Sequence, residues 1–299
     1  MENTTTPNNQ LRITLGHYAT MIISMYFNDI KDFINLEIGV KRYRGNMERF
    51  HFNPISLNKY SRKLFPNIET FHIYNKDDEI FKDGRIFKKV IWYKVDYSTY
   101  LKKKEKWSVY KNIEYTKGDI WKYGNTIPLE VTSIIYGCFE GDEELTSITI
   151  PTTVKEIGSS CFSKCSSLTS VSIPSTIREI EFRCFKECTT LPSIIIPPSV
   201  SEMGNYCFGY CTRLSSIDLS SSVNKIGNYC FIECSSLPSI NLPSSVCKIG
   251  DYCFYKCTSL TNITIPSTIT SFGRSCFFKC GCEEMLKKNE RIPKECFYE

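Results

Sequence analysis

The stretch CFIECSSLPSINLPSSVCKIGDY, residues 230–252, is one unit of a sequence that repeats along the second half of the chain. A Cys-Phe dipeptide begins each unit, at positions 138, 161, 184, 207, 230, 253 and 276, so the step is 23 residues without insertion. Five further apolar columns recur in the units, at the positions of Leu237, Ile240, Leu242, Val246 and Ile249. Such a period is typical of a solenoid, in which a unit buries its apolar face only against its neighbours.

Each unit contains two patterns with strand-like spacing and one with helical spacing. The L-x-x-I-x-I segment alternates as a short strand does, and proline ends it in most units. The V-x-x-I-G segment predicts a second short strand. In the remainder, Ile157, Cys161, Cys165 and Leu168 follow one another at steps of four, four and three residues. We therefore expect both cysteines on the inward face of one helical or 3₁₀ turn.

The cysteines invite a chemical explanation, but their pattern favours a structural one. All 16 lie at or beyond Cys138, whereas all three histidines precede residue 127, so the repeat region has no histidine to complete the four ligands of a zinc site. Disulfides within a pair are disfavoured because i,i+4 side chains in a turn lie wider apart than the about 3.8 Å mean Cβ separation of a bridge. Disulfides between stacked units are excluded less firmly, since strands stack about 4.8 Å apart. We expect reduced, buried thiols that fill the core, with no metal and no cofactor.

The consensus C-x-x-L-x-x-I-x-I-P-x-[ST]-[VI]-x-x-I-G-x-x-C-F resembles the BspA-like leucine-rich repeat family over residues 127–280. That family usually carries alanine where the first cysteine of each pair stands here. The resemblance implies a curved, right-handed solenoid with a parallel sheet, used for protein binding or adhesion rather than catalysis.

Composition divides the chain near residue 125. Residues 1–126 hold 22 Lys and Arg against 14 Asp and Glu, whereas the remainder holds 15 against 18. We expect an α+β repeat protein: a leucine-rich-repeat solenoid of 23-residue units with a parallel β-sheet, a small helical region before it and a cap after it. The predicted regions are 1–60 (helical), 61–126 (a degenerate, strand-rich cap), 127–280 (the solenoid) and 281–299 (a charged, helical C-terminal cap).

Residues 15–43 contain two segments with helical apolar spacing, and Asn28 or Asp29 is suited to cap the second. One interpretation is a helical hairpin that only packs or caps. The other is a resemblance to the F-box, which binds a ubiquitin-ligase adaptor and recurs together with leucine-rich repeats.

The F-box resemblance assigns adaptor contacts to Phe33, Leu36 and Val40. It departs from the F-box pattern at two places. Leu15-Gly16 stands where Leu-Pro is expected, and Tyr43 stands in the place of tryptophan.

Two columns of the repeat are candidate partner-binding surfaces. Side chains alternate across a strand, so the residues between the two isoleucine columns should face outward. These are Thr149, Ser172, Ile195, Asp218, Asn241 and Thr264. A second column, two residues after the glycine position, contains Tyr206, Tyr229 and Tyr252, which lie one unit apart and are spaced to stack. These tyrosines either cover the edges of the coils or bind a partner, since tyrosine is enriched at binding hot spots.

No catalytic spacing and no phosphate-binding glycine loop is found, so we expect a non-catalytic protein-interaction scaffold. The alternatives are an F-box-like substrate receptor of a ubiquitin ligase and a surface adhesin of the BspA type. The apolar stretch ITLGHYATMIISMYF contains a histidine and lacks a small-residue cleavage site, which argues against a secretory peptide. We expect a cytoplasmic monomer that binds proteins, without a transmembrane segment or a nucleic-acid partner.

Overall fold

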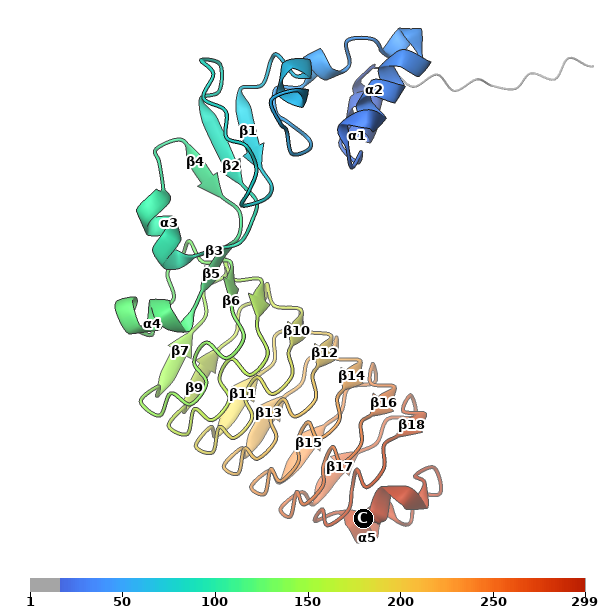
Figure 1. Cartoon of the computed structure of the whole chain (residues 1–299). Helices are drawn as coiled ribbons and strands as arrows, with labels where there is room; N and C mark the ends of the chain where they lie inside the picture. The colour runs from blue at the N-terminus through green and yellow to red at the C-terminus, as the bar shows by residue number, and fades with distance from the viewer. Residues whose placement is uncertain (1–16, 299) are drawn as a thin grey trace, which may run out of the picture. The chain divides into compact units, whose positions relative to one another are not determined.

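The computed structural model describes residues 17–298 (Figure 1). The chain forms two compact units, of which the first comprises residues up to 93 together with 104–111. The second comprises residues 94–103 and those from 112 onward. The boundaries expected at residues 60, 126 and 280 stay predictions.

The first unit begins with helices and continues into a parallel sheet. The helical elements are α1 (His17–Ser24), α2 (Ile30–Gly39) and three 3₁₀ turns, η1 (Lys41–Tyr43), η2 (Met47–Arg49) and η3 (Ser61–Leu64). The carboxylate of Asp29 accepts hydrogen bonds from the backbone N–H groups of Lys31 and Asp32, at 2.7 and 3.2 Å, which confirms the predicted cap of the second helix.

The sheet of the first unit contains β1 (Thr70–Ile73), β2 (Lys88–Ile91) and β4 (Ser108–Tyr110), paired in parallel in that order. Thr70 pairs with Lys88, and Lys89 with Ser108, so the strands recur every 18 or 19 residues. The segment from β1 to β4 is therefore coiled like the repeats. Its shorter period explains why it cannot be aligned with the 23-residue units.

The second unit is the solenoid. It begins with β3 (Val95–Asp96), α3 (Tyr97–Lys103), β5 (Ile113–Tyr115), α4 (Lys117–Tyr123) and β6 (Ser133–Ile134). Each later coil carries two short strands, so that two rows of strands run along the solenoid in Figure 1. One row contains β7 (Ser147–Thr149), β9 (Ser170–Ser172), β11 (Ser193–Ile195), β13 (Ser216–Asp218), β15 (Ser239–Asn241) and β17 (Asn262–Thr264). The other contains β8 (Glu156–Ile157), β10 (Glu179–Ile180), β12 (Glu202–Met203), β14 (Lys225–Ile226), β16 (Lys248–Ile249) and β18 (Ser271–Phe272). The chain ends with α5 (Glu283–Leu286) and η4 (Lys294–Phe297).

A column of phenylalanines, one from each Cys-Phe dipeptide, runs through the core. All seven are almost fully buried, and successive rings stack with centroids between 5.2 Å (Phe139–Phe162) and 5.8 Å (Phe254–Phe277). The apolar columns read from the sequence are also buried, with few exceptions. Each coil thus buries its apolar face only against the coils on either side.

The segment around each cysteine pair is not the helical or 3₁₀ turn that the spacing suggested. Ser160 and Lys164 have positive φ angles of 55° and 61°, and the same two positions have positive φ in every later coil. Alternate backbone N–H groups of the segment point away from their own turn and donate to carbonyl groups of the next coil. The Phe162 N–H, for example, donates to the Cys184 carbonyl at 2.9 Å. The segment is a run of tight turns whose backbone hydrogen bonds join one coil to the next, and both cysteines still point inward.

Two prolines divide the row of strands that contains β7. The Thr169 N–H donates to the Thr146 carbonyl at 2.8 Å and joins β9 to β7. Pro192 and Pro238 occupy the same column and have no N–H to donate. The row accordingly consists of three separate pairs, β7–β9, β11–β13 and β15–β17.

The other row is divided once, at a residue that breaks the glycine column. A Cβ atom on Gly204 would lie 2.6 Å from the backbone nitrogen of Phe182, in the preceding coil, and Gly158 is equally confined. Glu181 takes this position in its coil and carries a Cβ atom. The sheet β3-β5-β6-β8 therefore ends at β8, and a second sheet, β10-β12-β14-β16-β18, begins beyond the gap.

The C-terminal segment covers the last coil, although it contains less helix than expected. Helix α5 is one turn long, after which Cys296 and Phe297 take the place of an eighth Cys-Phe dipeptide. The Phe277 N–H donates to the Cys296 carbonyl at 3.0 Å, as the corresponding groups do between coils, and Phe297 stacks on Phe277. Arg291 donates to the carbonyl groups of Pro266, Ser267 and Ile269 at the open edge.

Candidate interaction surface

Three tyrosines from successive coils, Tyr206, Tyr229 and Tyr252, form what we call the tyrosine row. The Tyr206 and Tyr229 ring centroids are 4.4 Å apart at an interplanar angle of 3°, and those of Tyr229 and Tyr252 are 4.9 Å apart at 2°. All three side chains are half-buried. The stacking that the repeat spacing predicted is confirmed, and the three half-buried rings form a continuous aromatic strip.

The backbone of the tyrosine row is in the left-handed region, with φ between 54° and 59°. This conformation suits glycine, and Gly137 takes it at the same position of an earlier coil, with φ of 58°. A bulky residue with such a φ costs on the order of 1 kcal/mol or more. Three consecutive coils therefore place tyrosine where glycine would be less strained.

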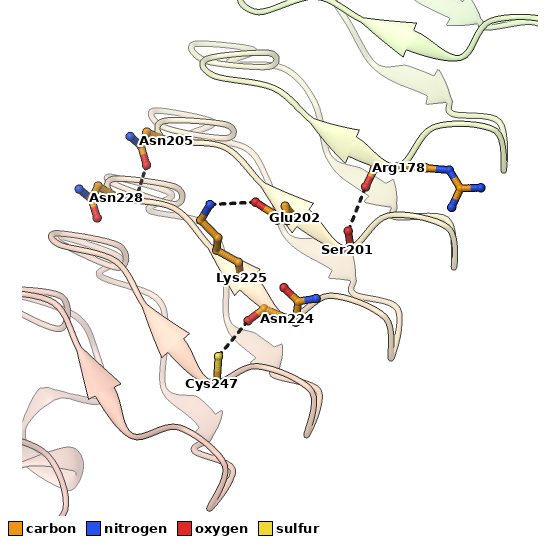
Figure 2. Close-up of polar contacts among 8 residues, drawn as sticks. All are labelled: Arg178, Ser201, Glu202, Asn205, Asn224, Lys225, Asn228 and Cys247. Atoms are coloured by element: carbon orange, nitrogen blue, oxygen red, sulfur yellow. Dashed lines mark hydrogen bonds and ion pairs between the residues drawn. The ribbon is translucent and has the colours of Figure 1, made fainter. Parts of the chain in front are cut away.

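A ladder of side-chain hydrogen-bond acceptors lies at the residues immediately before the tyrosines, Asn205, Asn228 and Asp251. Figure 2 draws the first two. The Asn228 N–H donates to the Asn205 side-chain carbonyl at 2.8 Å, and the Asp251 N–H donates to that of Asn228 at 2.9 Å. This ladder needs the glycine column, since a Cβ atom on Gly227 would lie 2.7 Å from the Asn205 Oδ1 atom. The sequence therefore fixes the backbone from which the tyrosines project.

Cations and carboxylates flank the tyrosine row. The Arg183 guanidinium lies 5.3 Å from the Tyr206 ring centroid and 4.6 Å from that of Phe182. On the neighbouring strands, Lys225 and Glu202 form an exposed ion pair at 2.8 Å, drawn in Figure 2. The strip is thus apolar along its length, with a cation at one end and mixed charges at its side.

The predicted strand face lies where the alternation placed it. Thr149, Ser172, Asp218, Asn241 and Thr264 are all exposed, and Ile195 is 72% exposed. The face is polar, but the two proline breaks divide it. A hollow of about 340 Å³ lies at the break between β9 and β11, lined by residues 169–173, 193–195 and Pro197.

The gap at Glu181 opens a larger hollow in the solenoid, of about 670 Å³. It is lined by Lys155, Glu156, Ile157, Ser175, Thr176, Arg178, Glu179 and Glu181. Cations and carboxylates are mixed around it, and burial and the nearby carboxylates Glu181 and Glu202 raise the pKa of Glu179. Sequence reasoning missed this hollow, although the exception in the glycine column was its signal.

The residues assigned to adaptor binding in the first unit differ in accessibility. Phe33 is fully buried and packs edge-to-face against Phe27, Phe50 and Phe65. Leu36 is half-buried, whereas Val40 is 42% exposed. Phe33 therefore belongs to the core of its unit, and Leu15-Gly16 lies outside the described residues.

The cysteines pack as expected of core residues. Fifteen of the 16 are buried, all 16 are unpaired in the structure, and Cys247 is the exposed one. Within residues 17–298 no group of three or more His, Cys, Asp or Glu side chains is arranged to hold a metal ion. No helix in this part of the chain is both long and apolar enough to cross a bilayer.

Comparison with known proteins agrees with this architecture. A leucine-rich repeat protein of T. pallidum, solved by crystallography, is 27% identical with a TM-score of 0.52, over 60% of this chain and 84% of that one. A leucine rich cell surface protein from Faecalibacterium prausnitzii A2-165 is 22% identical with a TM-score of 0.40, over 73% of this chain and 72% of that one. None of the curated proteins compared with the chain gives a match.

A sequence model of the BspA type leucine rich repeat region matches in six copies, over residues 124–237 and 179–299. These residues make up more than half of the chain. They include all seven regular Cys-Phe dipeptides and the C-terminal segment that completes the last coil. The chain belongs to the BspA-type leucine-rich repeat family.

Proposed function

We propose that the protein is a non-catalytic protein-interaction scaffold and that the tyrosine row is its principal binding surface. The observation that carries the proposal is the parallel stacking of Tyr206, Tyr229 and Tyr252, with ring centroids 4.4 and 4.9 Å apart. The left-handed backbone at this position is common to the coils, since Ser160, Arg183 and Ser275 share it, whereas these three consecutive coils place tyrosine there. Stacking holds the three rings in one strip.

The chemistry of the strip fits a protein partner. Tyrosine offers a large contact area at a small cost in conformational entropy, and arginine is the other residue enriched at hot spots. Arg183 lies at the end of the row, over the ring of Tyr206. Because the rings already stack on one another, little side-chain freedom is left to lose on binding.

The test replaces Tyr206, Tyr229 and Tyr252 together by alanine. Wild-type and variant chains are compared for proteins retained from native lysate by quantitative mass spectrometry. We expect partners retained by the wild type to be lost from the variant, with the circular dichroism of the solenoid unchanged. The matched control, Asn241→Ala with Thr264→Ala on the strand face, should retain them. Loss of partners from this control alone would move the binding surface to the strand face.

A second candidate function is adaptor binding by the first unit. Exposed apolar side chains occur on α1 and just after it, at Ile23 (44% exposed) and Tyr26 (79%), and on α2 and just after it, at Ile38 (74%) and Val40 (42%). Because Phe33 is buried, such a contact would use these residues and Leu36. Val40→Asp in the full chain should then abolish retention of a ubiquitin-ligase adaptor, whereas Lys31→Asp, a charge change on an exposed helical position, should not.

A further inference from the structure

One cysteine departs from the bonding pattern of its column. The second cysteine of each pair donates its thiol to a phenylalanine carbonyl of the preceding coil at 3.0 or 3.1 Å, in the case of Cys165, Cys188, Cys211, Cys234 and Cys257. Cys280 is the next member of this column. Its Sγ atom lies instead 3.4 Å from the Sγ atom of Cys282. The end of the solenoid therefore brings two thiols into direct contact.

These two thiols are also less completely enclosed than the others in the core. Cys280 is 6% exposed and Cys282 is 3% exposed, whereas the other 13 buried cysteines are each 0% exposed. Cys280 and Cys282 lie where the last coil gives way to α5, at the end of the solenoid. A small reagent needs a smaller local opening of the structure to reach these two thiols than to reach the cysteines of the interior coils.

The contact between the sulfurs also changes their acidity. The hydrogen bond between the two sulfurs, in which either thiol can be the donor, lowers the pKa of Cys282 against the opposing effect of burial. The same bond, together with burial, raises the pKa of Cys280. Elsewhere in the column burial dominates, as at Cys211, where it raises the pKa to about 12. Thiol–disulfide exchange proceeds through the thiolate, so Cys282 is the better nucleophile.

The intervening glycine allows the pair to form. A Cβ atom on Gly281 would lie 2.5 Å from the Thr258 carbonyl oxygen and 2.9 Å from that of Leu260. The Gly281 N–H also donates to the Cys257 carbonyl at 3.0 Å. Two residues of chain span at most about 7 Å, which overlaps the range of about 4.4–6.8 Å between the Cα atoms of a disulfide. This upper limit leaves room for a Cys280–Cys282 bridge, and the two sulfurs already lie 3.4 Å apart.

We propose that Cys280 and Cys282 form the oxidation site of this protein, a dithiol that low-molecular-weight disulfides convert to an intramolecular disulfide. The Cys282 thiolate attacks glutathione disulfide and releases one glutathione as its thiolate. The Cys280 thiol then loses its proton and attacks the Cys282 sulfur of the mixed disulfide, releasing the second glutathione. Two protein thiols are oxidised to one disulfide while one glutathione disulfide is reduced to two glutathione thiols.

The sequence supplies a specific readout. Trypsin cleaves after Lys279 and Lys287, so both cysteines lie in the single peptide CGCEEMLK. The folded full-length protein is incubated in buffers of increasing glutathione disulfide to glutathione ratio and quenched in acid. It is then denatured with an alkylating reagent and digested. We expect this peptide to pass from the doubly alkylated form to an unalkylated form that has lost two hydrogen atoms, while peptides with interior cysteines stay alkylated.

Two variants complete the test. Cys280→Ser removes the resolving thiol, so Cys282 should accumulate as the mixed disulfide with glutathione. Cys257→Ser keeps both members of the pair and should leave the oxidation of CGCEEMLK unchanged. The proposal is overturned if the wild-type peptide stays doubly alkylated at every ratio. It is also overturned if the wild type stops at the mixed disulfide, or if interior cysteines oxidise at the same ratio.

Discussion

Glu181 occupies the position in its coil that Gly204 occupies in the next, and the sheet is open on the side where Glu181 meets the preceding coil. The Gly204 N–H donates to the Ile180 carbonyl at 2.7 Å and joins β12 to β10. Residue 181 makes no such bond to β8 in the described structure, since the two strands belong to different sheets. Between Gly158 and Gly273, the one position of this column that carries a Cβ atom thus coincides with the one break in the pairing of this row.

This relationship predicts opposite tolerances at two equivalent positions. Gly227→Ala should destabilise the solenoid by about 2 kcal/mol, because the new Cβ atom would lie 2.7 Å from backbone atoms of the preceding coil. Glu181→Ala should change the free energy of unfolding by less than about 0.5 kcal/mol, since that position already carries a Cβ atom. Chemical denaturation of both variants measures the difference, and equal effects would contradict the proposed cause of the gap.

Backbone strain in the tyrosine row can be separated from ring stacking. Tyr229→Gly and Tyr229→Ala both remove the ring that lies between Tyr206 and Tyr252, but only glycine suits a φ of 59°. We expect the glycine variant to be more stable than the alanine variant by about 1 kcal/mol, measured by urea denaturation. If alanine proves the more stable of the two, the left-handed backbone is not a source of strain.

Proline should be the cause of the breaks in the strand face. Pro192→Ser supplies an N–H group at this position. In the next coil, the equivalent N–H group of Ser215 donates to the Pro192 carbonyl at 2.9 Å. The new amide is expected to bond to the Thr169 carbonyl and to exchange slowly with deuterium. Pro243→Ser, at a proline beyond the end of β15, provides the control and should not change protection within the strands. Rapid exchange at residue 192 would assign the break to another cause.

The first unit should lose stability in acid through His72. Burial, followed by the charges of Lys111 and Lys88, lowers the pKa of His72 to about 4, below its ordinary value near 6.5. Because the unfolded chain takes up the proton more readily, the contribution of His72 is complete above pH 6.5 and is lost as the pH falls toward 4.

We expect this loss to reach about 1 kcal/mol, since the half-exposed ring keeps part of its hydration. Hydrogen exchange of the first unit's strands, recorded in the full-length protein at several pH values, measures it. His72→Gln should flatten the dependence. The control His51→Gln, at a side chain that is 68% exposed, should leave it in place.

The fold of residues 127–280 could be predicted from the sequence because the same apolar columns recur in each unit. An exception in one unit therefore did not hide the pattern. The outward strand positions and the stacking of Tyr206 on Tyr229 followed from the same columns. The turn at Cys161 was misread because a four-residue apolar step also arises in consecutive tight turns, and Gly137 and Gly141, both with positive φ, were the available signal.

Other features had little repetition to support them. The strands before residue 127 recur at 18 or 19 residues, with too few shared side chains to reveal their period. The contact between Cys280 and Cys282 arises where the repeat ends, so no column could predict it. Phe33 was assigned to an adaptor contact from the F-box resemblance, and a resemblance over about 30 residues does not show which side of a short helix packs against neighbours that are unknown.

The phenylalanine column has a consequence for how such a chain can change in length. Every coil from Phe139 to Phe277 presents the same ring to both neighbours, so the aromatic core is the same at each junction between coils, even where the strands are not paired. Duplication or loss of one 23-residue segment would recreate a junction that already exists, without a new core having to evolve. Gene rearrangement can therefore add or remove tyrosines of the row one coil at a time. The length of the binding surface can then change in evolution while the residues that form it stay the same.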